Sequence, residues 1–161
     1  MNLFDKILEM AKTKKVKVFF DMDGTCAEFK SGEKNDILTN KKGLFLDKRP
    51  IKTVLKVMER LSKIPNVEVC ILSNCHYQEQ KEEKIEWLRK FTPFIIPENI
   101  FIIVLSNENY TSDNKHFLKG NKIKKILSSD ETAFLIEDDH RVIKATQSLG
   151  IDAEHVSMLI E

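Results

Sequence analysis

Short apolar runs alternate with longer amphipathic segments along this chain, and this alternation restricts its fold more than any other feature. Five runs of five or six residues are rich in Val, Ile, Leu and Phe or in smaller apolar residues, as expected of buried strands. They lie at residues 16–20, 67–72, 100–105, 132–136 and 153–157. Apolar residues recur at helical spacing in the remaining segments, at residues 3–14, 50–63, 78–91, 121–127 and 142–149. The pattern predicts an α/β protein, a Rossmann-like three-layer α/β/α sandwich around a mainly parallel sheet.

Length, charge and cysteine content narrow the class of protein. A chain of 161 residues fits one domain, so we expect a single core over residues 1–161. The formal net charge of +1 argues against a long nucleic acid or an anionic membrane as partner, and no stretch is apolar enough for a membrane span or signal peptide. Three cysteines without CxxC spacing indicate free thiols in a reducing compartment. We therefore expect a cytoplasmic monomer or homodimer.

The first candidate for chemistry is Asp21-Met22-Asp23-Gly24-Thr25, which directly follows the apolar run at 16–20. Open parallel sheets bind ligands beyond the carboxyl ends of their strands, so this motif lies where a site is expected. Two carboxylates two positions apart can meet at one cation if the chain turns, and the glycine permits that turn. An Asx turn or a helix N-cap would use similar residues. An EF-hand would need its glycine later in the loop and a helix before it.

A polar pair follows the second predicted strand. Ser73 and Asn74 come directly after the run at 67–72. A hydroxyl at a strand end, followed by free backbone N–H groups, can hold a phosphate oxygen. Serine and asparagine are also ordinary turn residues, so the position of this pair on a neighbouring parallel strand is what makes it a candidate.

Three consecutive acids, Glu137, Asp138 and Asp139, follow the apolar run at 132–136. Adjacent carboxylates at a buried strand end repel one another unless cations neutralise them. A solvated acidic loop, or negative charge at the start of the next helix, is the alternative interpretation. Because hard oxygen ligands suit Mg²⁺, we expect this group to share a magnesium ion with Asp21 and Asp23.

A lysine is expected to balance these acids. Five candidates lie between the third and fourth predicted strands: Lys115, Lys119, Lys122, Lys124 and Lys125. Lys122 is near the start of the predicted helix at 121–127, whose N-terminus should face the carboxyl edge of the sheet. We therefore predict Lys122 as the site lysine, with Lys119 as the alternative.

With these four motifs in this order, the sequence resembles the haloacid-dehalogenase-like (HAD) phosphohydrolases. The resemblance covers nearly the whole chain from residue 16 onward and is most similar to the small 5′-nucleotidase or 5′(3′)-deoxyribonucleotidase branch. Supporting stretches lie at residues 43–46, 49–50, 83–88 and 120–122. Family members often have an acidic pair, a helix and then Ala-x-x-x-Gly. Counting back from Gly150 places that acidic pair on Glu137 and Asp138, with Asp139 one position beyond it.

The resemblance implies a mechanism as well as a fold. It implies that Asp21 attacks phosphorus to form an aspartyl-phosphate, and that Asp23 acts as general acid and base. Ser73 and Lys122 would hold the other phosphoryl oxygens, and Thr25 would brace the first motif. The resemblance also implies that magnesium is bound by Asp21, the backbone carbonyl of Asp23 and Asp138, with Glu137 in support.

In this branch the segment after the first motif forms a small cap, here residues 26–49. Phe29 and Phe45 are expected either to line a base-binding pocket or to seal the cap against the core. With Thr25 and Asn74 they complete the predicted substrate-binding residues. The expected substrate is a small phosphorylated metabolite, with a nucleoside monophosphate as the first choice.

Other functions remain open from the sequence. The same site would accept a sugar phosphate, another small metabolite or a polynucleotide 3′-phosphate, or would pass the phosphoryl group to an acceptor other than water. A non-catalytic binding module with the same fold is the alternative of a different class, although a binding role would not require Asp23.

Overall fold

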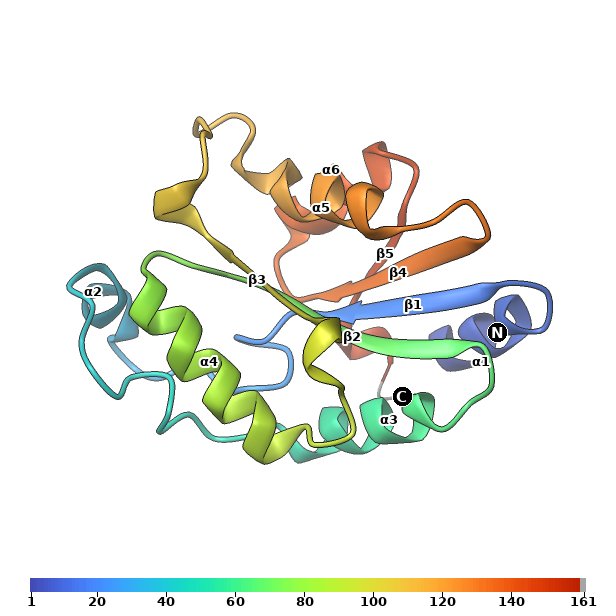
Figure 1. Ribbon diagram of the computed structural model, residues 1–161, viewed down its shortest axis with the longest axis horizontal. Helices are drawn as coiled ribbons and strands as arrows, with labels where there is room; N and C mark the ends of the chain where they lie inside the picture. Colours follow the sequence, from blue (N-terminus) through green and yellow to red (C-terminus); the bar gives the residue numbers. More distant parts are fainter. Residues whose placement is uncertain (160–161) are drawn as a thin grey trace.

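The computed structural model describes residues 1–159 and contains one five-stranded sheet in the order β3-β2-β1-β4-β5 (Figure 1). All four neighbouring pairs of strands are parallel. The strands are β1 (Lys15–Phe20), β2 (Val67–Cys75), β3 (Ile100–Val104), β4 (Glu131–Glu137) and β5 (Asp152–His155). The predicted α/β sandwich with a parallel sheet is therefore confirmed.

Within residues 1–159 the chain forms six α-helices, five of which cover the two faces of this sheet. They are α1 (Leu3–Ala11), α2 (Glu33–Leu38), α3 (Lys52–Ser62), α4 (Gln78–Phe91), α5 (Leu118–Ile126) and α6 (His140–Ser148). The helices α1, α3 and α4 pack on one face, and α5 and α6 pack on the other (Figure 1). None of the helices within residues 1–159 is long and apolar enough to cross a membrane.

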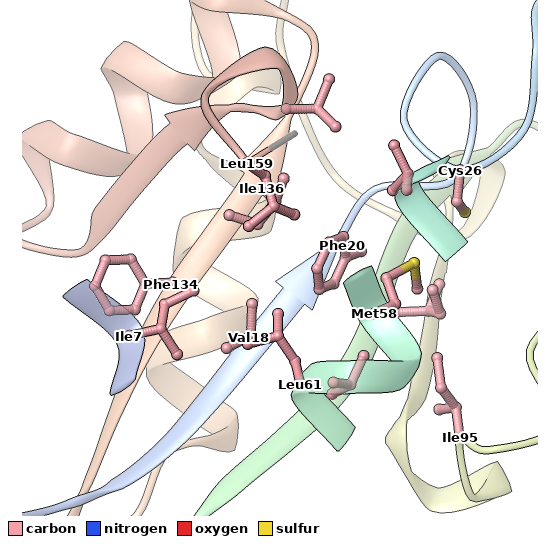
Figure 2. Close-up of a cluster of buried hydrophobic side chains, with 14 of the residues drawn as sticks. Ile7, Val18, Phe20, Cys26, Met58, Leu61, Ile95, Phe134, Ile136 and Leu159 are labelled. Carbon is pink, nitrogen blue, oxygen red and sulfur yellow. The ribbon is translucent and has the colours of Figure 1, made fainter. Parts of the chain in front are cut away.

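The central strand β1 contributes to two apolar cores because its side chains alternate between the faces of the sheet. Val18 and Phe20 point into the larger core, where they meet Met58 of α3 and Phe134 of β4 (Figure 2). Phe19 points into the smaller core under α5 and α6. This burial on both faces accounts for the continuous apolar run that precedes Asp21.

The order of the strands places the site. From β1 the chain moves outward to β2 and β3, and then returns to the other side of β1 to form β4 and β5. Open parallel sheets bind ligands at the carboxyl edge where the order reverses in this way. The ends of β1, β2 and β4 therefore lie together at that edge.

Two differences from the sequence-based boundaries bear on the site. Strand β2 continues to Cys75, so Ser73 and Asn74 lie within it. Helix α5 begins at Leu118, three residues earlier than predicted, and contains Gly120. A Cβ on Gly120 would lie 2.6 Å from Leu149 Cδ1, so the missing side chain lets α5 approach the end of α6.

The segment 26–49 leaves the core after the first motif and returns just before α3. It contains α2, which the periodicity did not predict because the helix is only six residues long. Glu83 of α4 accepts hydrogen bonds from the backbone N–H groups of Gly43 (2.9 Å) and Phe45 (3.1 Å), which attaches the segment to α4. Its division from the core as a cap stays a prediction.

Candidate active site

A pocket of about 340 Å³ opens at the carboxyl edge of the sheet. Its polar lining comes from the ends of β1, β2 and β4, from Lys84 of α4, and from the starts of α5 and α6 with the residues just before α5. An apolar wall comes from segment 26–49. The residues that border it include Asp21, Asp23, Phe29, Phe45, Asn74, Lys84, Lys119, Glu137 and Asp138.

Three carboxylates converge in this pocket. One oxygen from each of Asp21, Glu137 and Asp138 lies within 4.8 Å of the other two. Asp21 follows β1, whereas Glu137 ends β4 and Asp138 follows it. The predicted meeting of these acids, which are more than a hundred residues apart in sequence, is therefore present. A set of hard oxygen donors this close together suits a divalent cation.

Lys119 is the buried cation at this cluster. Its ammonium donates to Asp21 Oδ1 (2.8 Å) and to Glu137 Oε2 (2.6 Å). Lys122, the predicted site lysine, is exposed and borders a separate groove beside β3. Since α5 starts at Leu118, Lys119 lies in its first turn and Lys122 about 4.5 Å farther along the axis. The prediction for Lys122 is wrong, and the alternative, Lys119, occupies the position.

Two acids of the cluster, Asp21 and Asp138, have pKa values above the ordinary range for aspartate. Burial raises the pKa of Asp21 to about 7, and repulsion from Glu137 adds to this effect while Lys119 opposes it. Burial also raises the pKa of Asp138 to about 6, and the charge of Asp21 contributes. The pKa of Lys119 lies above its ordinary value, because attraction to Asp21 and Glu137 outweighs the cost of burial. A bound cation would relieve the repulsion among these carboxylates.

Asp139 is separate from the cluster. Its side chain accepts from the backbone N–H of Arg141 (2.9 Å), so it caps α6, and it pairs with the Arg141 guanidinium (3.1 Å). Glu137, in contrast, accepts from Lys119 and from the backbone N–H of Asp138 (3.1 Å). Glu137 and Asp138, the predicted acidic pair, therefore lie together at the cluster, whereas Asp139 caps α6.

Asp23 is held at both carboxylate oxygens by buried lysines. Lys48 donates to Oδ1 at 2.7 Å, and Lys84 donates to Oδ2 at 2.6 Å. Burial acts to raise the pKa of Asp23, but the two ammonium groups outweigh it and hold that pKa below its ordinary value. Asp23 is thus a carboxylate in the substrate-free protein.

The sequence interpretation missed both of these lysines. Lys84 lies in residues 83–88, one of the stretches that carry the family resemblance, so its position was a usable signal. Lys48 stands in a charged, ordinary-looking segment, and only the fold shows that its side chain is fully buried.

Ser73 and Asn74 meet Lys84. The lysine donates to Ser73 Oγ (2.8 Å) and to the Asn74 carbonyl (2.7 Å). Asn74 also borders the pocket, and its side-chain oxygen is buried without a hydrogen-bond partner among the described residues. An unpaired buried amide oxygen at a pocket wall is free to meet a bound group or water.

Gly24 and Thr25 shape the first motif. Gly24 has φ +78°, and a Cβ there would collide with Asp138 Oδ2 and with the Phe29 ring. Glycine is therefore needed both for the turn and for the close approach of the acids. Thr25 is fully buried and does not border the pocket, so its position agrees with bracing the turn and not with the predicted substrate contact.

The two predicted aromatic residues differ in exposure. Phe29 is 61% exposed and Phe45 only 2% exposed, and both border the pocket. Phe29 is therefore largely accessible to solvent beside the pocket, whereas Phe45 packs within the protein. The position of Phe29 thus fits the expectation of lining a pocket, and the position of Phe45 fits that of sealing the segment against the core.

Comparison with known proteins identifies the family. The model of the family described as 5′ nucleotidase, deoxy (pyrimidine), cytosolic type C protein (NT5C) matches residues 33–151. The chain belongs to this family. The nucleotidases of this family are HAD-type phosphate monoester hydrolases, so the predicted superfamily, branch and enzyme class are confirmed. HAD phosphatases generally use a divalent metal, and the acidic cluster is present for it. The first motif lies before the matched residues, so its assignment depends on the geometry described above.

A solved structure supports the fold. The HAD domain of the effector protein Lem4 from Legionella pneumophila matches with a TM-score of 0.52 at 16% sequence identity. The match covers 88% of this chain and 85% of that domain. Comparison with curated proteins gives no match.

Proposed function

We propose that this chain is a Mg²⁺-dependent nucleotidase that hydrolyses a nucleoside monophosphate through an aspartyl-phosphate on Asp21. The observation that carries the proposal is the meeting of Asp21, Glu137 and Asp138 within 4.8 Å, with the Lys119 ammonium between two of them. Asp23 lies at the same pocket, with its side chain 20% exposed.

The charges around the pocket favour a divalent cation. Five buried or partly buried carboxylates face three buried ammonium groups, so the fully ionised cluster has two more negative than positive charges. The members are Asp21, Asp23, Glu33, Glu137 and Asp138, with Lys48, Lys84 and Lys119. Asp21 and Asp138 would hold Mg²⁺, with Glu137 in support. When bound, the ion would screen Asp21 from the negatively charged phosphate and offset charge on the phosphoryl oxygens.

The proposed nucleophile, Asp21, keeps one carboxylate oxygen clear of Lys119. Lys119 occupies Oδ1, which leaves Oδ2 of this carboxylate available. The new bond joins an Asp21 oxygen to phosphorus while the ester P–O bond breaks, and the leaving alkoxide takes a proton. Water then attacks the phosphorus of the intermediate, which releases inorganic phosphate and restores the Asp21 carboxylate.

Asp23 donates a proton in the first step and accepts one in the second. As a carboxylate it can accept the proton of the attacking water in the second step. In the first step it needs a proton to pass to the leaving oxygen. The second ionisation of a phosphate monoester is near pH 6, so the substrate monoanion can supply this proton through Asp23.

The pocket suits a small nucleotide. Phe29, Ile37 and Phe45 form an apolar wall beside the polar floor, and the exposed Phe29 ring can stack on a base. The volume of about 340 Å³ is at the small end for ligand pockets. Together with the family description, this favours a pyrimidine deoxyribonucleoside monophosphate.

Location and assembly belong to the same proposal. The three cysteines are free, and the family description includes the word cytosolic, which supports a cytoplasmic enzyme. A monomer or homodimer stays the prediction for its assembly, and size-exclusion chromatography with light scattering would distinguish the two.

A substrate panel tests the proposed function. Purified protein with Mg²⁺ should hydrolyse nucleoside 5′- or 3′-monophosphates faster than sugar phosphates. Asp21→Asn should abolish turnover, whereas Asp130→Asn, an exposed aspartate near the opposite end of the sheet, should not. Activity in Asp21→Asn that matches the wild type would exclude Asp21 as nucleophile, and faster turnover of sugar phosphates would change the substrate class.

A further inference from the structure

We propose that Lys48 is a positioning residue that connects segment 26–49 to Asp23 and aligns the carboxyl group for proton transfer. The inference rests on the proposed function, because it concerns the group that protonates the leaving oxygen. Lys48 does not border the pocket, so it acts through Asp23 and not on the substrate.

The ammonium of Lys48 lies between two carboxylates. It is 2.7 Å from Asp23 Oδ1 and 2.6 Å from Glu33 Oε2, and its side chain has no exposed surface. The rings of Phe45 and Phe29 lie 5.1 Å and 5.7 Å from it. This enclosure leaves Lys48 little freedom to move away from Asp23.

Asp23 is fixed from two sides by different parts of the molecule. Lys84 of α4 holds Oδ2 and also contacts Ser73 and Asn74 of β2, so this side belongs to the core. Lys48 holds Oδ1 and connects it to Glu33 at the start of α2. Without Lys48 the carboxylate would be held at one oxygen and could rotate about that contact.

The backbone of Lys48 is itself anchored. Its carbonyl accepts a hydrogen bond of 2.9 Å from Trp87 Nε1, and Trp87 is a buried residue of α4. The side chain therefore extends from a fixed base toward Asp23. A buried charge between two acids is costly to maintain, and apolar packing often stabilises a fold as well, so a functional reason for Lys48 is expected.

Proton transfer depends on close alignment. A general acid must lie within about 2.6–3.2 Å of the oxygen that it protonates, and displacements near 1 Å can cost on the order of 100-fold in rate. The alkoxide leaving group of a nucleotide needs this proton. The p-nitrophenolate ion is stable enough to leave without it, so its ester is insensitive to the alignment of Asp23.

The test compares kcat/KM for these two esters, because kcat/KM includes only the steps up to loss of the leaving group. The variants are Lys48→Met, Glu33→Gln and the charge-balanced double variant. Lys17→Met is the matched control, because Lys17 also lies between two acids, Glu68 (2.8 Å) and Glu131 (3.4 Å), near the opposite end of the sheet.

Lys48→Met and the double variant should lower kcat/KM for a nucleoside monophosphate by at least about tenfold relative to p-nitrophenyl phosphate. Glu33→Gln should shift the same ratio by a smaller factor, and Lys17→Met should leave it unchanged. If circular dichroism shows that Lys48→Met alone does not fold, the Glu33→Gln and double variants supply the result.

Three outcomes are distinct. An equal loss of kcat/KM for both esters means that Lys48 only supports the fold, and unchanged kcat/KM values for both esters mean that Asp23 does not need it. Either result overturns the inference while leaving the nucleotidase in place. If the wild-type protein hydrolyses neither ester with Mg²⁺, the proposed function fails first, and the inference fails with it.

Discussion

At the scale of single residues, the site combines carboxylates, two of which have raised pKa values, with buried lysines that pair with carboxylates of the site. Lys119 is buried between Asp21 and Glu137, whereas Lys122, on the same helix, faces solvent. The same residue type thus has two different surroundings within one turn. This contrast makes the lysine assignment directly testable.

Lys119→Met should lower kcat on the order of 100- to 1,000-fold, as expected when one group that stabilises developing charge is removed. Lys122→Met should change kcat less than about twofold, because surface substitutions away from special features have small effects. Steady-state kinetics on both folded variants makes the comparison. Loss of activity in Lys122→Met alone would reverse the assignment.

Metal affinity should depend on pH, because protons compete with the cation for Asp21 and Asp138. Their pKa values in the metal-free protein are about 7 and about 6. Both groups are ionised at pH 8 and largely protonated at pH 5.5. The dissociation constant for Mg²⁺ should therefore rise on the order of 100-fold when the pH is lowered from 8 to 5.5. Isothermal titration calorimetry at the two pH values measures it. A constant affinity would exclude these carboxylates as the ligands.

Gly24 and Gly32 allow a matched comparison of two alanine variants. Both have positive φ, at +78° and +73°, but a Cβ collides with neighbours only at Gly24. Each Ala variant should lose about 1–2 kcal/mol of unfolding free energy from the left-handed backbone. Only Gly24→Ala should also weaken Mg²⁺ binding, since its Cβ displaces Asp138. Equal metal affinity in the two variants would contradict the close approach seen here.

At the scale of secondary structure, the sequence predicts the strands and helices that have a clear local pattern of apolar residues. The five strands and the helices with long amphipathic patterns were found, because burial fixes their periodicity. The early start of α5 was missed, since the packing of Gly120 against Leu149 is a tertiary contact. That error of three residues moved the lysine prediction from Lys119 to Lys122.

Short elements and long-range pairs carry no such periodic signal. Helix α2 spans six residues, which is too short for a clear pattern. The contacts of Lys48 with Asp23 and Glu33 depend on where segment 26–49 lies over the core. Periodicity therefore could not separate Lys48 from the many exposed lysines.

Helix α4 anchors segment 26–49 through the carboxylate of Glu83. In Glu83→Gln one oxygen becomes an NH₂ group, so one of the two bonds from Gly43 and Phe45 is lost. A hydrogen bond to a charged group contributes about 1.5–3 kcal/mol, so amide exchange at these positions should accelerate by roughly tenfold or more. Glu82→Gln, at an exposed position of the same helix, should leave it unchanged. Equal exchange in both variants would show that Glu83 does not hold the segment.

At the scale of the whole molecule, the order of the strands brings the residues of the site together. Because β2 and β4 lie on opposite sides of β1, the ends of all three strands meet. Residues near positions 21, 73 and 137 become neighbours although they are far apart in sequence. The alternation of strands and helices predicted this meeting, and the preference of parallel sheets for ligands at their carboxyl edge predicted its place.

The central claim is that Asp21 is the nucleophile and shares one divalent ion with Asp138. A crystal structure with Mg²⁺ and beryllium fluoride, a mimic of a phosphoryl group on aspartate, tests it most directly. We expect beryllium bonded to an Asp21 oxygen, and Mg²⁺ bonded to both Asp21 and Asp138. A beryllium adduct on another residue, or an ion held without Asp21, would contradict the account.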